Sequence, residues 1–185
     1  VAVKAGYVTK KDTISVTEDT EKTITMEKAP ESTRKDVSAA WKNFRNSDDN
    51  MGITSAKTPT SEATTYEKWF KKLGSGWGAA PSVQIIVDNS LIVMSANHIY
   101  KLDLNTGDIL QTGDMVAATN FGYTPPTYAD GMIFAPLADG RVQAFNAETL
   151  ESLWVYQDTL KGQSLSPITY SDGYIYTGFW NAETK

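Results

Sequence analysis

Three segments in the second half of the chain repeat one another at a constant spacing. They are residues 86–93 (IVDNSLIV), 128–135 (YADGMIFA) and 170–177 (YSDGYIYT). Their aspartates, Asp88, Asp130 and Asp172, lie 42 residues apart. A fixed period of about 40–45 residues, with each unit built from short strands, is typical of the blades of a β-propeller. The repeat therefore predicts an all-β fold.

Residues 125–156 contain the pattern of one complete blade. The pattern predicts four short strands, at residues 127–128, 132–135, 141–145 and 153–156. The two turns between the first three strands, Asp130-Gly131 and Asp139-Gly140, end in a glycine, which accepts the positive φ that a tight hairpin needs. Residues 146–149 make the last turn. Four strands joined by short hairpins form one propeller blade.

The unit before this blade shows the same order, and the unit after it is unfinished. Strands are expected at residues 91–94 and 98–102, with a turn at 105–107. Trp69 lies two periods before Trp154 to within one residue, so residues 68–71 are expected to form the outer strand of an earlier blade. The third repeat stops at Lys185. We expect a partial propeller of about three four-stranded blades, incomplete at its C-terminus and completed by remaining blades or by a second copy, because closed propellers have about 4–8 blades.

The first 29 residues differ in character from the repeats. Polar and apolar residues alternate around residues 1–7, 12–17 and 22–27, which predicts three short antiparallel strands, too few to hold a core alone. Residues 30–36 are polar without periodicity and are expected to be a linker. The propeller is assigned to residues 37–185. Within it, residues 41–54 are expected to be irregular but anchored by apolar side chains, and residues 55–65 to form an exposed loop.

Composition excludes several classes of function. The net charge of −5 argues against a nucleic-acid partner, because phosphate neutralisation needs clustered Lys and Arg. The chain has no cysteine, which removes thiol catalysis, disulfides and cysteine-based metal sites. No window is long and apolar enough for a membrane span. The chain begins at Val1 without a targeting segment, so it reads as an internal segment whose signal lies outside it.

Two stretches resemble a known repeat family. Residues 99–108 (IYKLDLNTGD) resemble the repeat of pyrroloquinoline-quinone-type, quinoprotein-dehydrogenase-like β-propellers, and residues 41–54 resemble the opening sequence of that group. Residues 5–10 and 23–26 resemble the end of an Ig-type domain of the PEGA or carboxypeptidase-regulatory kind, which implies a β-sandwich remnant. Similar chains are cell-surface proteins of Gram-positive anaerobes, so the resemblance implies a bacterial, extracellular or cell-surface location.

The resemblance implies either a quinone-dependent enzyme or a non-catalytic protein. Enzymes of this family hold a quinone near the central channel with calcium beside it, and many carry an adjacent cysteine pair. Non-catalytic members with the same repeat are numerous, and nothing in this chain marks a set of catalytic carboxylates. We therefore expect no catalytic residue, no cofactor and no metal. A quinone-dependent oxidoreductase remains the alternative.

Three further features are weighed as metal or catalytic sites. Residues 103–108 resemble the start of an EF-hand calcium loop, but the sixth position is Asp108 where that loop needs glycine. A hairpin turn with Gly107 in the left-handed region is expected there. Residues 47–50 are either a solvated turn or a weak calcium site. His98 is the single histidine, so surface or cross-strand packing is expected rather than general-base catalysis.

A positional pattern indicates a ligand-binding face. Four residues before each blade's proline (Pro81, Pro125 and Pro167) stand Trp77, Phe121 and Gln163. Tyr123 lies beside the second of them. In a propeller these positions enter the innermost strand from the loop between blades, where an aromatic ring can stack on a sugar, a peptide or a flat cofactor. The candidate ligand-binding residues are Trp77, Phe121, Tyr123 and Gln163, with inter-blade packing as the competing interpretation.

Three functions follow as hypotheses. The first is a non-enzymatic binding or scaffolding segment of an exported surface protein, with a protein or carbohydrate ligand. The second is part of a quinone-dependent oxidoreductase. The third is an assembly role like that of outer-membrane propellers in β-barrel biogenesis, which an envelope without an outer membrane would exclude.

Overall fold

The computed structural model describes residues 10, 12–28, 36–119 and 124–181. The chain divides into two compact units, Val1–Thr33 and Arg34–Lys185. The only helices in the described residues are two short 3-10 turns, η1 (Glu62–Thr64) and η2 (Trp77–Ala79). No helix in this part of the chain has the length and apolar character that a bilayer crossing requires. The fold is all-β, as the repeat predicts.

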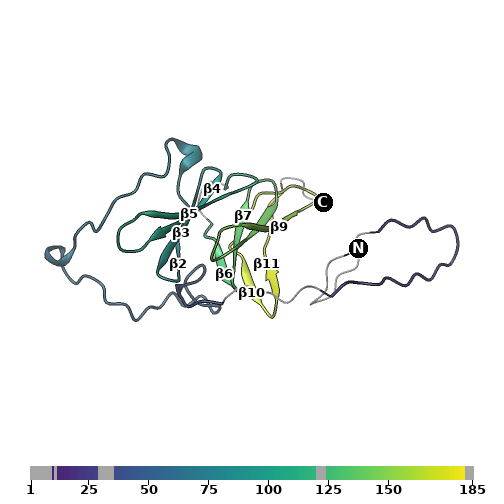
Figure 1. Cartoon of the computed structure of the whole chain (residues 1–185), viewed down its shortest axis with the longest axis horizontal. Coiled ribbons are helices and arrows are strands. Elements are labelled where there is room, and N and C mark those ends of the chain that lie inside the picture. The colour runs from purple at the N-terminus through teal and green to yellow at the C-terminus, as the bar shows by residue number, and fades with distance from the viewer. Residues whose placement is uncertain (1–9, 11, 29–35, 120–123, 182–185) are drawn as a thin grey trace. The chain divides into compact units, whose positions relative to one another are not determined.

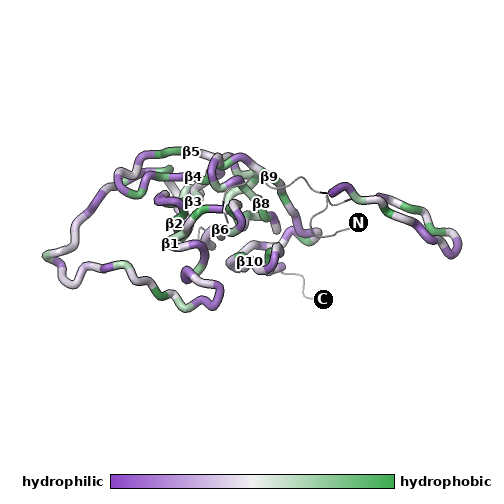
Figure 2. The backbone as a smooth tube through the Cα atoms, turned by 60° about the horizontal axis from the view of Figure 1, so that its bottom comes forward, coloured by the Kyte–Doolittle hydropathy of each residue, from purple (hydrophilic) through white to green (hydrophobic). Residues whose placement is uncertain are grey.

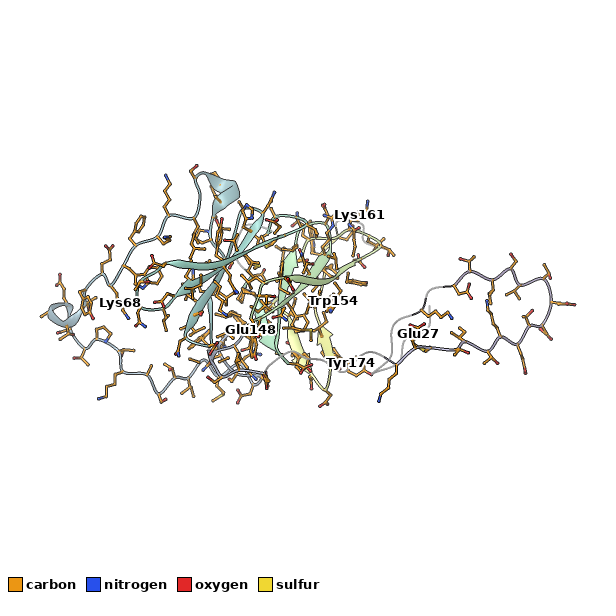
Figure 3. The ribbon with its side chains drawn as sticks, viewed as in Figure 1. Glu27, Lys68, Glu148, Trp154, Lys161 and Tyr174 are labelled. Carbon is orange, nitrogen blue, oxygen red and sulfur yellow. The ribbon has the colours of Figure 1, made fainter. Side chains whose placement is uncertain are left out.

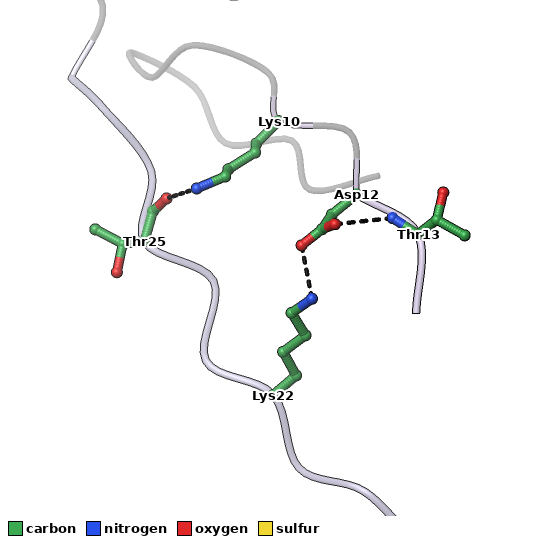
Figure 4. A network of polar contacts seen from close by, with 5 residues as sticks. All are labelled: Lys10, Asp12, Thr13, Lys22 and Thr25. Carbon is green, nitrogen blue, oxygen red and sulfur yellow. Dashed lines mark hydrogen bonds and ion pairs between the residues drawn. The ribbon is translucent and has the colours of Figure 1, made fainter. Parts of the chain in front are cut away.

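In the first unit, residues 12–27 run as extended segments without forming a strand. The Lys22 ammonium lies 2.6 Å from the Asp12 carboxylate, and Lys10 donates a hydrogen bond to the carbonyl of Thr25 (Figure 4). The strands predicted at residues 12–17 and 22–27 are therefore wrong. The physical reason is that their apolar side chains have no core to enter: Val16, for example, is 64% exposed. The strand predicted at residues 1–7 and most of the predicted linker lie outside the described residues.

The second unit begins with a five-stranded antiparallel sheet in the order β1-β2-β3-β4-β5. Its strands are β1 (Ala39–Trp41), β2 (Ile85–Val87), β3 (Ser90–Ser95), β4 (His98–Asp103) and β5 (Ile109–Asp114). The last four strands are the first predicted blade. The sequence pattern missed β1, of which only Trp41 lay in the segment expected to be irregular. It forms because Ala39 and Trp41 pair with the free edge of β2, more than forty residues further along the chain.

The second sheet is the complete blade predicted from residues 125–156. It has the order β6-β7-β8-β9, formed by β6 (Thr127–Ala129), β7 (Met132–Leu137), β8 (Arg141–Asn146) and β9 (Ser152–Gln157). The third sheet has two strands, β10 (Thr169–Ser171) and β11 (Tyr174–Tyr176). Figure 1 shows the first two sheets side by side, with β10 and β11 next to β6. These open, incomplete sheets confirm a partial propeller.

The repeated aspartates begin tight turns, as expected. Asp88, Asp130 and Asp172 all have φ near +50°, and the next residue is also left-handed in each copy. Two consecutive positive φ values define the hairpin turn whose twist matches that of the flanking strands. Aspartate, asparagine and glycine tolerate this conformation best, which explains why these residue types recur at a fixed spacing.

The period lengthens by one residue between β7 and β8. Ser95 pairs with His98 across a two-residue turn, whereas Leu137 pairs with Arg141 across a three-residue turn. Between the first two blades the spacing is thus 42 residues for β6 and β7 and 43 residues for β8 and β9.

Two apolar layers join the sheets. The layer between the first and second sheets contains Ile85, Ile92, Met94, Ile99, Ile133, Leu137, Phe145 and Leu150, all buried. The layer between the second and third sheets contains the buried residues Phe134, Val142, Ala144 and Ile168. In Figure 2 the strands of the second unit carry many hydrophobic segments, and the long connection between β1 and β2 is mostly hydrophilic or neutral. Burial of alternating strand faces thus stacks the blades.

Gln143 adds a polar bridge between the first two blades. Its side chain is 1% exposed, and its Nε2 atom donates to the carbonyl of Asp114. Its Oε1 atom accepts a hydrogen bond of 2.9 Å from the backbone N–H of Val116. A buried amide is tolerated because both of its ends are paired. The bridge holds the end of β5 against β8.

Residues 68–71 do not form the predicted outer strand. Instead, Trp69 is held as a single anchor: its indole N–H donates to the carbonyl of Leu104, and its ring lies against Gly107. Residues 55–65 are exposed throughout, as expected.

Candidate binding site

The structure places two of the four predicted ligand-binding residues. Trp77 begins η2 and is 86% exposed, so it is not packed between blades. Gln163 is half-buried, and its backbone exchanges two hydrogen bonds with Trp180, of 2.7 and 2.9 Å. Phe121 and Tyr123 lie outside the described residues. Trp77 and Gln163 make no hydrogen bond with each other, and the binding role of the set stays a prediction.

Trp77 stands on a short turn that is firmly attached to the first sheet. The hydroxyl of Ser95, at the end of β3, donates a 2.7 Å hydrogen bond to the carbonyl of Ala79. Ser82 follows, and its backbone N–H donates to the carbonyl of Met94. Gly76, immediately before Trp77, has φ of +75°, a conformation that suits glycine. The ring is thus presented to solvent from a fixed backbone.

A polar cavity of about 460 Å³ lies beside the inner strands of the second and third sheets. Its walls include Asp36, Lys42, Asp48, Tyr128, Tyr170 and Asp172. Lys42 makes an ion pair of 2.8 Å with Asp48. The segment that carries Lys42 is held against the second blade, because the backbone N–H of Tyr128 donates to the Lys42 carbonyl.

Tyr128, which lines this cavity, has a strongly raised pKa. Its hydroxyl donates a 2.6 Å hydrogen bond to Asp36 and accepts one from the backbone N–H of Val37. Burial raises the pKa of Tyr128 to about 12, and the hydrogen bond to the Asp36 carboxylate adds to that rise. The phenol therefore stays protonated at neutral pH and acts as a hydrogen-bond donor. Sequence patterns missed this residue, since its partners lie about ninety residues away.

An open apolar groove of about 510 Å³ runs between the second and third sheets. One wall is formed by Val142, Trp154 and Tyr156, and the other by Ile175, Tyr176 and Phe179. Trp154 and Tyr156 remain 39% and 52% exposed (Figure 3, where Trp154 is labelled). The rings of Tyr156 and Phe179 stack across the groove with centroids 6.4 Å apart. The sequence analysis placed Trp154 and Tyr156 on an outer strand but did not single them out for binding.

The hairpin turn at residues 103–108 and the cross-strand packing of His98 are observed as expected. Residues 103–108 form a hairpin turn with Gly107 at φ of +74°. The carboxylate of Asp103 accepts from the backbone N–H groups of Asn105 and Thr106, which lowers the pKa of Asp103. His98 packs across the strands, with Nδ1 3.0 Å from the Asp114 carboxylate and its ring against Tyr100.

Residues 47–50 form a turn whose groups pair with one another. The Ser47 hydroxyl accepts from the backbone N–H of Met51, while Asp48 is paired with Lys42. A hydrogen bond from Ser47 lowers the pKa of Asp49. Within the described part of the chain, no three His, Cys, Asp or Glu residues are arranged to hold a metal ion.

Comparison with protein families gives one match. Residues 60–179 match the family model described as "Outer membrane protein assembly factor BamB" (PQQ_2). A search of the curated proteins finds no significant match.

Comparison with solved structures gives several propeller proteins. Quinohemoprotein alcohol dehydrogenase ADHIIG from Pseudomonas putida HK5 is 19% identical, with a TM-score of 0.61 over 76% of this chain and 23% of its own. BamB from Moraxella catarrhalis is 21% identical, with a TM-score of 0.49 over 63% of this chain and 38% of its own. The chain thus spans well under half of either protein. At this identity the dehydrogenase likeness establishes the fold alone.

Proposed function

Because residues 60–179 place this chain in the BamB-type PQQ_2 family, we propose that it is a non-enzymatic binding and scaffolding segment of an exported propeller protein. The observation that supports a binding role most directly is Trp77, a tryptophan that is 86% exposed on an anchored turn. Large aromatic rings presented on rigid backbone are common anchors for protein and carbohydrate ligands, since they give apolar contact area at little entropic cost.

A protein ligand fits the surroundings of Trp77 better than a charged polymer does. The residues next to it in the chain, Gly76, Gly78 and Ala79, are small and uncharged, so an approaching backbone meets no steric or charge barrier. A Cβ at Gly76 or Gly78 would meet no atom within 4 Å, which shows that the surface around the ring is open. A carbohydrate, whose apolar ring face also stacks on indole, is the other ligand class to test.

The experiment compares two exposed aromatic residues. The 185-residue chain and the variants Trp77→Ala and Tyr66→Ala are screened on a glycan array and in pull-downs from a bacterial envelope extract. Tyr66 is 80% exposed on the long connection and serves as the matched control. The proposal expects a ligand retained by wild type and Tyr66→Ala and lost by Trp77→Ala. Silence in both screens, or equal retention by all three proteins, contradicts it.

Scaffolding is supported by the open third sheet. In the second sheet, β7 pairs with β6 on one side and with β8 on the other. In the third sheet β11 takes the place of β7, and among the described residues no strand pairs with the side of β11 that faces away from β10. Beside that edge lies the apolar groove with Trp154 and Tyr156. We propose that further strands, from remaining blades or from a second copy, complete this sheet. A concentration-dependent dimer in sedimentation equilibrium favours the second copy, and a strict monomer rules it out.

An assembly role at the outer membrane is the second candidate, favoured by the family description alone. It predicts that the parent protein co-purifies with β-barrel assembly components from a host that has an outer membrane. A host without that membrane excludes it. A quinone-dependent activity is tested separately: addition of quinone and calcium must produce a spectral change and dye-linked turnover of alcohols or sugars.

A further inference from the structure

A second cavity lies under the segment that precedes the first blade. It has a volume of about 290 Å³ and lies, partly open to solvent, between residues 69–81 and the face of the first sheet that carries Leu91, Val93 and Leu102. The cover is attached at three points. The indole of Trp69 donates to the carbonyl of Leu104, Ser95 donates to the carbonyl of Ala79, and Ser82 bonds with Met94. The cavity is therefore preformed rather than dependent on a loose loop.

The inner wall of this cavity is apolar. Val93 and Leu102 are 2% and 1% exposed, and Leu73 and the ring of Trp69 close the opposite side. Close approach within the cover depends on Gly74, because a Cβ there would lie 2.5 Å from the Cβ of Ala79. Such a wall gains free energy from covering a hydrocarbon chain and none from covering a charge.

Two adjacent lysines, Lys71 and Lys72, also line the cavity. Among the described lysines, Lys42 pairs with Asp48 and Lys68 donates to the side chain of Asn105, whereas the exposed Lys57 and Lys161 have no side-chain partner. Lys71 and Lys72 make no ion pair or hydrogen bond with any residue that the structure describes. In a chain with a net charge of −5, this is a local positive site beside an apolar cavity.

We propose that this cavity binds a small amphipathic anion, with a hydrocarbon tail against Val93 and Leu102 and a carboxylate or similar single anionic head at Lys71 and Lys72. Ammonium groups bind such a head as mobile point charges with three donors each. A ligand pocket is usually about 300–1,000 Å³ in volume, and this one is at the lower limit, so the tail is short. The site is separate from Trp77, which does not line the cavity.

The test uses octanoate as the probe and the whole 185-residue chain, with binding measured by titration calorimetry. We expect one saturable site with a Kd between about 0.1 and 5 mM, typical of a small fragment. Octan-1-ol and octylamine have the same tail without the negative charge and should bind about tenfold more weakly or worse. The absence of saturable octanoate binding at about 10 mM overturns the proposal.

Paired variants locate the head group. Lys71→Gln with Lys72→Gln removes both charges from the cavity, whereas Lys57→Gln with Lys161→Gln removes two exposed charges elsewhere. We expect the first pair to weaken octanoate binding about tenfold and the second to leave it unchanged. Equal binding by both paired variants shows that the head does not lie at Lys71 and Lys72 and rejects the site.

Methyl NMR locates the tail without any change in the core. Octanoate should shift the methyl signals of Leu91, Val93 and Leu102 and leave those of Leu160 and Leu165, which are exposed elsewhere, in place. Shifts confined to other methyl groups place the ligand outside the cavity and overturn the proposal.

Discussion

The ring of Trp69 lies directly against Gly107, thirty-eight residues further along the chain: a Cβ on Gly107 would be 2.6 Å from the Cε3 atom of Trp69. Gly107 is left-handed, and its backbone N–H donates to the carbonyl of Asp103. In the next blade the equivalent N–H belongs to Leu150, which donates to Asn146 and is also left-handed. The same turn thus carries glycine where an indole covers it and a buried leucine where none does.

The contact between Trp69 and Gly107 makes Gly107→Ala costly for two reasons. A left-handed alanine costs about 1–3 kcal/mol, and displacement of the indole adds about 1–3 kcal/mol. Gly173→Ala is the matched control, because Gly173 is also left-handed but has no atom within 4 Å of its Cβ position. Urea unfolding should show a larger loss for Gly107→Ala than for Gly173→Ala. Equal losses of unfolding free energy in the two variants would mean that the Trp69 ring moves aside without a cost in stability.

Leu150 should reverse the usual order of alanine and glycine. Leu150 is 2% exposed with φ of +57°. Its truncation to alanine removes core contacts at a cost of about 2–5 kcal/mol. Leu150→Gly removes the same contacts but relieves the left-handed strain, so it should be at least as stable as Leu150→Ala, whereas glycine is otherwise less stable by about 1 kcal/mol. Thermal unfolding of both variants measures the difference. If Leu150→Gly unfolds at a lower temperature than Leu150→Ala, the backbone of Leu150 is not strained.

Gly113 on β5 tests the packing between the first two blades. A Cβ at Gly113 would lie 2.7 Å from the carbonyl oxygen of Leu150 and 3.0 Å from the Cγ2 atom of Ile99. Because the first contact is with backbone, Gly113→Ala should force the blades apart at a cost of about 1–3 kcal/mol. Gly78→Ala, whose Cβ would meet nothing, should lose far less stability in the same denaturant titration. An unchanged midpoint for Gly113→Ala would show that the two sheets slide easily.

Tyr128 should make stability fall at high pH. Its folded pKa of about 12 lies above the ordinary value of 10, so the unfolded chain loses the proton first. The stabilisation by the protonated hydroxyl is complete below pH 10 and is lost as the pH rises toward 12, by about 2–3 kcal/mol. Tyr128→Phe lacks this titration. The difference in unfolding free energy between wild type and Tyr128→Phe should therefore shrink between pH 10 and 12; a constant difference would contradict the coupling to Asp36.

The strands of the complete blade were predictable because their signals are local. Asp130-Gly131 and Asp139-Gly140 adopt positive φ in the structure, and β7, β8 and β9 each begin within two residues of the residue that the turns indicate. The hairpin turn at Gly107 and the cross-strand packing of His98 were likewise confirmed. Trp77 was identified as a candidate by its position before Pro81, but its exposure could not be derived from that position.

The errors concern segments whose structure depends on distant partners. Residues 12–17 alternate like a strand but have no apolar layer to cover, and alternation alone does not hold a strand in water. Residues 68–71 resemble an outer strand, yet Trp69 is used as an anchor on Gly107 instead. The spacing between Trp69 and Trp154 therefore does not correspond to equivalent strands.

The amino-acid sequence by itself determined the repeat, the positions of the tight turns and the all-β fold, because each of these follows from the conformational preferences of neighbouring residues. Only the tertiary structure decided that β1 pairs with β2, that Tyr128 is held by Asp36, and that Lys71 and Lys72 face an apolar cavity. These contacts join residues brought together by the stacking of blades, and apolar burial is non-directional, so no local pattern specifies which distant residues meet.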